Sequence, residues 1–77
     1  MKYFTTLMKG EPHEPKTAIC VHHSYDLDTK VFNIFSFEVF KEDKQRNAKP
    51  VKWSEEAVRV QLGAHLYSYG IDNSEKY

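Results

Sequence analysis

Residues 53–71 read Trp53-Ser-Glu-Glu-Ala-Val-Arg-Val-Gln-Leu-Gly-Ala-His-Leu-Tyr-Ser-Tyr-Gly-Ile71, and this stretch predicts one amphipathic helix over residues 54–69. Ser54 is a suitable N-cap, because its hydroxyl can accept a hydrogen bond from an unpaired N–H group of the first turn. The two glutamates that follow it place negative charge at the positive end of the helix dipole. Gly70 can adopt the left-handed conformation that ends a helix, which would let the next residue fold back onto the last turn.

The predicted helix has two apolar arcs that lie on nearly opposite sides. The wider and more apolar arc is expected to face a sheet, because a helix lying on a sheet buries one stripe. Its members are Val58, Leu62, His65, Leu66 and Tyr69. The members of the second arc are Ala57, Val60, Ala64 and Tyr67. This second arc either contacts a partner or packs through Val60 and Tyr67 under the loop 41–52 or the C-terminal tail.

Three segments that precede the helix predict β-strands, at residues 2–8, 17–23 and 30–40. All three are rich in aromatic and β-branched residues. In the third strand the apolar residues change face partway along, which indicates either a β-bulge or a central strand covered on both faces. The residues on one face are Phe32 and Ile34, and those on the other are Phe35, Phe37 and Val39.

The predicted fold is one small α+β domain over residues 1–77. It consists of a three-stranded antiparallel sheet (a β-meander) with the C-terminal helix packed on one face, in the order β-β-β-α. Residues 41–52 are expected to form a basic loop, and residues 72–77 a frayed polar tail. Because one helix covers only one face of a sheet, the other face would expose large aromatic side chains unless something else covers it.

The composition limits the classes of function. The 77 residues include 11 basic and 11 acidic ones, and this zero net charge argues against a dedicated nucleic-acid binder. The single cysteine cannot form an internal disulfide, which favours a reducing, cytoplasmic setting. The apolar run of residues 3–8 is too short and too polar for a signal peptide or a membrane span, so we expect a soluble protein that does not contact membranes.

One candidate metal site involves Cys20 and His22, which lie two residues apart on one strand face. His13, Glu11 and Glu14 lie in the preceding loop. Zinc requires three or four ligands in tetrahedral geometry, and no second pair occurs at ligand spacing. We therefore expect no metal and no cofactor.

Cys20 with a histidine is also the minimal nucleophile–base pair of an enzyme. Cys20 lies in the middle of a predicted strand, however, whereas activated thiols lie at positions that lower their pKa. The sequence contains no phosphate-binding loop and no nucleophile elbow. We expect no catalytic residues, with Cys20 as a small buried side chain and His22 and His23 near solvent at a strand end.

The sequence favours a small non-catalytic protein-interaction module that uses Val60, Ala64 and Tyr67. Its expected partner is another protein, a second copy of itself in a homodimer, or both. A compact chain without catalytic motifs suits a phage or mobile-element accessory protein that inhibits a host protein. The alternative is a nucleic-acid-binding accessory protein, because basic residues around an aromatic ring are typical of single-strand binders. The residues of this alternative are Lys44, Arg46, Lys49, Lys52 and Trp53.

Overall fold

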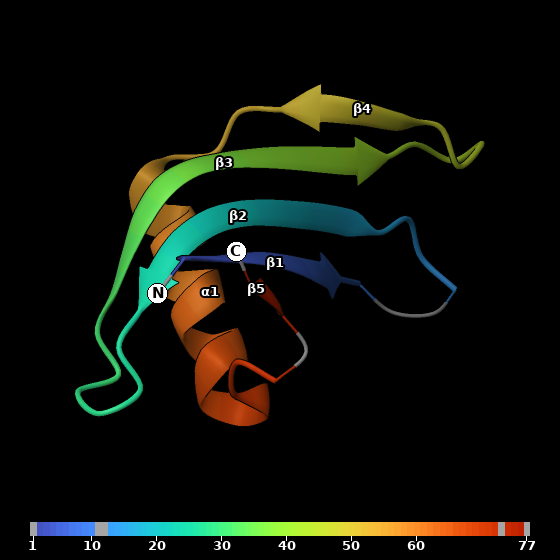
Figure 1. Cartoon of the computed structure of the whole chain (residues 1–77). Helices are drawn as coiled ribbons and strands as arrows, with labels where there is room; N and C mark the ends of the chain where they lie inside the picture. The colour runs from blue at the N-terminus through green and yellow to red at the C-terminus, as the bar shows by residue number, and fades with distance from the viewer. Residues whose placement is uncertain (1, 11–12, 73, 77) are drawn as a thin grey trace.

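The computed structural model describes residues 2–10, 13–72 and 74–76 and shows an antiparallel sheet with one helix on one face (Figure 1). The elements are β1 (Lys2–Lys9), β2 (Thr17–Tyr25), β3 (Phe32–Glu42), β4 (Ala48–Val51), α1 (Glu55–Tyr69) and β5 (Glu75–Lys76). The strands lie in the order β4-β3-β2-β1-β5, and all neighbours are antiparallel. The α+β architecture with a C-terminal helix is thus confirmed. No helix in this part of the chain is long and apolar enough to cross a membrane.

The predicted number of three strands is wrong, because the described residues form five. Strands β1 to β3 form the expected meander, but the predicted loop 41–52 contains β4 and the predicted tail 72–77 contains β5. Asn73 and Tyr77 of that tail lie outside the described residues. The sequence of β4 includes Pro50, which cannot donate a backbone hydrogen bond and is tolerated because β4 is an edge strand. The two residues of β5 are too few to give a sequence pattern, and they pair with the start of β1.

A bulge in β3 explains the change of face in its sequence. The register pairs His22 with Ser36 and His23 with Ile34, so Phe35 has no partner on β2 and is 58% exposed. This extra residue turns both apolar pairs of β3 toward the same side of the sheet, where they belong to the core or pack against it. These residues are Phe32, Ile34, Phe37 and Val39. Of the two explanations that the sequence allowed, the bulge is the one observed.

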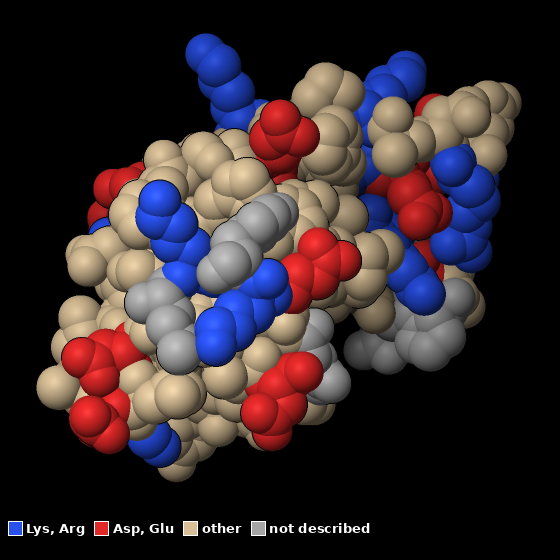
Figure 2. Space-filling model, in the orientation of Figure 1, with Lys and Arg blue, Asp and Glu red and all other residues tan. Residues whose placement is uncertain are grey.

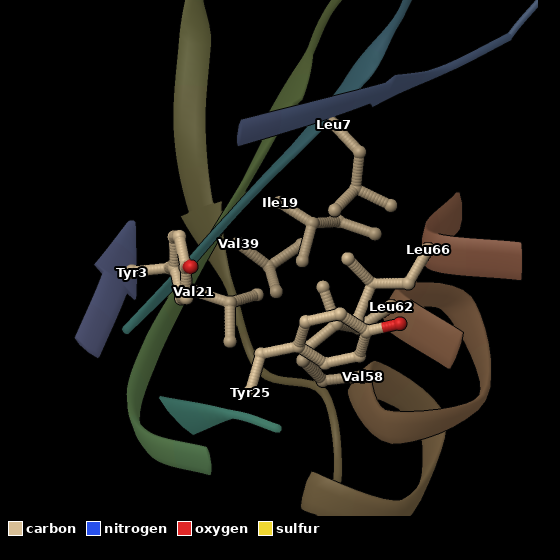
Figure 3. Packing of buried hydrophobic residues seen from close by; sticks show 9 residues of the cluster. All are labelled: Tyr3, Leu7, Ile19, Val21, Tyr25, Val39, Val58, Leu62 and Leu66. Carbon is tan, nitrogen blue, oxygen red and sulfur yellow. The ribbon is translucent and has the colours of Figure 1, made fainter. Parts of the chain in front are cut away.

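The core lies between α1 and one face of the sheet (Figure 3). The helix contributes Val58, Leu62 and Leu66, which form one buried stripe at a spacing of four residues. The sheet contributes Tyr3, Leu7, Ile19, Val21, Tyr25 and Val39. The predicted core arc is confirmed for these three helical residues, but Tyr69 is 64% exposed. Tyr69 is the last helical residue, and its ring lies 5.1 Å from the ring of His65.

Both ends of α1 carry the predicted caps. The Ala57 N–H group donates to the Ser54 hydroxyl at 3.2 Å, and the Gly70 N–H group donates to the Leu66 carbonyl at 2.8 Å. Gly70 has φ 71° and ψ −164°. Its φ is positive as predicted, but its ψ lies outside the left-handed helical region, in a conformation open chiefly to glycine. The chain then continues to Ile71, which packs against the core.

Truncation of Leu62 tests the orientation of α1. We expect Leu62→Ala to lower the free energy of unfolding by about 2–5 kcal/mol, because the buried side chain would leave a cavity. Tyr69→Ala is the matched control, since Tyr69 belongs to the same predicted arc but is exposed, and should cost less than about 1 kcal/mol. Urea denaturation measures both, and equal losses would contradict this orientation.

Removal of the Ser54 hydroxyl tests the start of α1. We expect Ser54→Ala to lower the free energy of unfolding by about 1 kcal/mol, because the Ala57 N–H group loses its acceptor. Ser68→Ala is the control, since Ser68 is an exposed residue within the helix, where alanine is at least as favourable as serine. An unchanged denaturation midpoint for Ser54→Ala would show that the cap contributes no stability.

Candidate functional site

The side of α1 that points away from the sheet carries the three residues predicted to bind a partner. Val60 is 61% exposed, Tyr67 is 94% exposed, and Ala64 between them is also exposed. Their spacing of four and three residues puts them on one side of the helix. We call this surface, Val60, Ala64 and Tyr67, the outward face. Its residues do not pack beneath the neighbouring segments of the chain, which was the other expectation.

A shallow hollow adjoins the outward face where the chain enters α1. It has a volume of about 430 Å³ and is lined by Trp53, Ala57, Val60 and Gln61. Trp53 is half-buried, because it packs against the core, and it also lines the hollow. A hollow with mainly apolar lining beside an exposed helix can accept an apolar side chain of another protein.

The charges near the outward face are mainly acidic. Glu55 and Glu56 are exposed in the first turn, the last turn contains no basic residue, and the exposed Asp72 follows. Arg59 is exposed as well, but its guanidinium group lies 5.6 Å from the centre of the Phe32 ring and is thus held toward the sheet. The first turn of α1 therefore carries two carboxylates, and its last turn has no basic side chain.

The five residues of the nucleic-acid alternative are spread from a turn to the entry of the helix. Lys44 and Arg46 lie in the turn between β3 and β4, Lys49 lies in β4, and Lys52 and Trp53 follow that strand. The four residues of β4 separate the two ends of this set by about 13 Å of extended chain. Trp53 packs against the core and is half-buried, so only part of its side chain is open to bases.

Cys20 and His22 lie on the face of the sheet that α1 does not cover. Cys20 is half-buried, and the Thr6 hydroxyl lies 4.0 Å from its sulfur atom. His22 is exposed, and its ring meets the ring of Phe4 edge to face, with 4.8 Å between their centres. Glu11 of the candidate zinc set lies outside the described residues. Within the ranges that the structure describes, no three His, Cys, Asp or Glu side chains are placed to share a metal ion.

His23 lies in the core, which corrects the expectation that it is near solvent. Its Nε2 atom lies 2.6 Å from the Thr5 hydroxyl, which lies 2.6 Å from the Ser74 hydroxyl. Its Nδ1 atom lies 3.1 Å from the Ser24 carbonyl oxygen. Because a carbonyl only accepts, Nδ1 carries the proton, Thr5 donates to Nε2, and Ser74 donates to Thr5. A neutral imidazole therefore satisfies the whole chain of hydrogen bonds.

This chain of hydrogen bonds has a structural role. It links Ser74, which precedes β5, to Thr5 in β1 and through Thr5 to His23 in β2. Burial lowers the pKa of His23 below its ordinary value of 6.5. The hydrogen bond to the Ser24 carbonyl opposes this shift, and the neighbouring His22 adds to it. The sequence signal for a buried His23 was its alternation with Ile19 and Val21, which share its face.

Comparison with known proteins finds no match for this chain. No protein-family model matches it, and neither a curated protein nor a solved structure does. The surfaces described above are therefore the basis for a functional proposal.

The buried His23 predicts a pH dependence of stability. As the pH falls below 6.5, the unfolded chain takes up a proton on this residue before the folded protein does. The free energy of unfolding should therefore be highest above that pH and decrease from there down to the lowered pKa. Urea denaturation between about pH 8 and pH 5 measures this decrease.

Two glutamine variants separate His23 from its neighbour. His23→Gln should have a flatter stability profile, and His22→Gln should keep most of the wild-type slope, because burial is the larger cause of the shift. If His23→Gln does not fold, an NMR titration of the wild-type ring replaces it. A ring that titrates at or above 6.5, or a slope that survives in His23→Gln, would contradict the assignment.

Proposed function

We propose that this chain is a non-catalytic protein-interaction module that binds another protein through the outward face of α1. The main support is the exposure of Val60 and Tyr67 beside the hollow at Trp53. Adjacent exposed apolar side chains on a small soluble domain commonly mark an interaction site. Tyrosine and tryptophan are also the side chains that most often dominate the binding energy of protein interfaces.

An apolar helix is the partner segment that fits this surface best. Ala64 lies in the middle of the outward face, and its small side chain lets another backbone approach closely. A helix that crosses there could place one apolar side chain in the hollow and another against Tyr67. The carboxylates of Glu55 and Glu56 favour basic residues on the partner beside the first turn.

A second copy of the chain fits this surface less well. In an antiparallel pair of α1 helices with a two-fold axis at Ala64, the first turn of one helix lies opposite the last turn of the other. Glu55 and Glu56 would then find no basic side chain in the facing turn, so this pairing lacks the charge complementarity that a basic partner could supply. We therefore take a different protein as the occupant, and the homodimer is an outcome that the experiment can detect.

Such binding suits an accessory protein by which a phage or mobile element inhibits a host protein. A small chain can inhibit without chemistry of its own if it occupies a surface that the host protein needs. This role rests on the outward face of α1.

Val60→Glu tests the outward face. We expect it to weaken the binding of a partner captured by the wild-type chain by at least about tenfold, because the new charge would be desolvated in the contact. Gln45→Glu is the matched control, since it adds the same charge in the exposed turn between β3 and β4 and should bind as wild type does. Titration calorimetry with the purified partner measures the affinities, and circular dichroism checks both folds.

Sedimentation equilibrium distinguishes the two possible occupants. A wild-type chain that is monomeric at high micromolar concentration supports a different protein as the partner. A dimer that Val60→Glu dissociates would instead assign the outward face to self-association. Partner binding that Val60→Glu leaves unchanged would overturn the outward face as the contact.

A further inference from the structure

A row of basic side chains crosses the sheet near the end where β1 and β3 finish. The strand registers pair Lys9 with Thr17, Thr17 with Lys41, and Lys41 with Lys49. These four residues, one from each of the adjacent strands β1, β2, β3 and β4, are therefore neighbours across the sheet. We call these four residues, Lys9, Thr17, Lys41 and Lys49, the basic row.

The basic row lies on the same side of the sheet as α1 but beyond the helix. Residues two apart along a strand share a face. The residues two positions before or after the basic row are Leu7, Ile19, Val39 and Val51, and the first three are buried in the core. The three lysines are exposed, and the strands continue past the helix at this end (Figure 1).

The nearest carboxylates of β3 and its turn are engaged away from the basic row. Glu42 follows Lys41 and so points to the opposite face, where its carboxylate lies 3.4 Å from the Arg46 guanidinium group. The Asp43 carboxylate accepts two backbone N–H groups of its own turn. Figure 2 shows Lys and Arg side chains gathered around acidic ones at the upper right, over this end of the sheet. In the ranges described, the ion pairs found involve none of the three lysines.

The basic row is electrostatically unfavourable in the free protein. Lys41 and Lys49 are direct cross-strand neighbours, and like charges at such positions destabilise an antiparallel pair. The whole chain has no net charge, so these lysines are a local concentration and not part of a general excess. A bound anion with several charges would relieve the repulsion.

We propose that the basic row binds the phosphate backbone of duplex nucleic acid. Four adjacent strands span about 14 Å, and lysine and threonine side chains are common partners of phosphate oxygens. The basic row contains no aromatic residue on which unpaired bases could stack, and this favours a duplex over a single strand. Because strand pairing fixes the spacing of the row, it suits the regular array of phosphates on a duplex better than it suits a flexible acidic peptide.

This site is separate from the outward face of α1 and does not depend on it. Contacts made only to phosphates predict binding that is independent of sequence and steeply dependent on salt. For three lysine contacts, the logarithm of the association constant should fall with the logarithm of the salt concentration with a slope of about −2.7. Fluorescence anisotropy with a labelled DNA duplex at several salt concentrations measures that slope.

Two triple variants separate the basic row from net charge. The first combines Lys9→Gln, Lys41→Gln and Lys49→Gln, and should lose nearly all of the salt dependence. The control combines Lys2→Gln, Lys30→Gln and Lys76→Gln, three exposed lysines outside the row, and should keep the wild-type slope. If the first triple variant does not fold, the three single variants replace it, and each should reduce the slope by about 0.9.

The probes compared are the duplex, a single strand of equal length, a polyglutamate peptide and vesicles with anionic lipids. Tighter binding to the duplex than to the other three, lost only in the first triple variant, supports the proposal. Tighter binding to any other probe overturns the duplex as the ligand. Equal losses in the two triple variants, or no binding to the duplex at low salt, overturn the site itself.

Discussion

The extra residue at Phe35 decides which side chains of β3 can contribute to the core. Side chains alternate between the two faces of a strand, so a single added residue exchanges the faces of everything that follows it. With the bulge, Phe32 and Ile34 before it and Phe37 and Val39 after it are on the side that faces α1. The core has nine buried apolar side chains in the described part of the chain. If the contacts of these four β3 residues were lost, few other apolar side chains could replace them.

The two proposed surfaces arise from a mismatch between the helix and the sheet. The 15 residues of α1 rise about 22 Å, whereas the 11 residues of β3 extend about 37 Å. The helix therefore covers only part of the face on which it lies, and the basic row stands where that cover ends. The outward face has a different origin, since a single helix on a sheet has no second layer above it. A single helix packed on the sheet thus leaves two chemically distinct surfaces exposed, the apolar outward face and the basic row.

The parts of the fold that could be predicted are those with a repeated sequence signal. The helix was marked by Ser54 at its start, by Gly70 at its end and by the stripe of Val58, Leu62 and Leu66 between them. Strands β1 to β3 were marked by runs of β-branched and aromatic residues. These signals are local, because each depends on residues within one element.

The parts that could not be predicted depend on partners that are distant in the sequence. Strand β4 contains a lysine and a proline, and it forms by pairing with the edge of β3. Strand β5 has only two residues and forms by pairing with β1. The basic row joins Lys9 to residues more than thirty positions later, so only the strand registers reveal it. The outward face was visible on a helical wheel, but the hollow at Trp53 required the packing of the loop against the core.

The proline of β4 has a consequence for the behaviour of the protein at high concentration. Sheets with open edges can add further strands and grow into fibrils. Here one edge strand has only four residues and includes Pro50, which offers no N–H group to an incoming chain, and the other has only two residues. Where β3 extends beyond its pairing with β4, the bulge at Phe35 interrupts the regular edge. The β4 edge thus offers an incoming strand few regular hydrogen-bonding positions, whereas residues 5–9 of β1 extend beyond the pairing with β5.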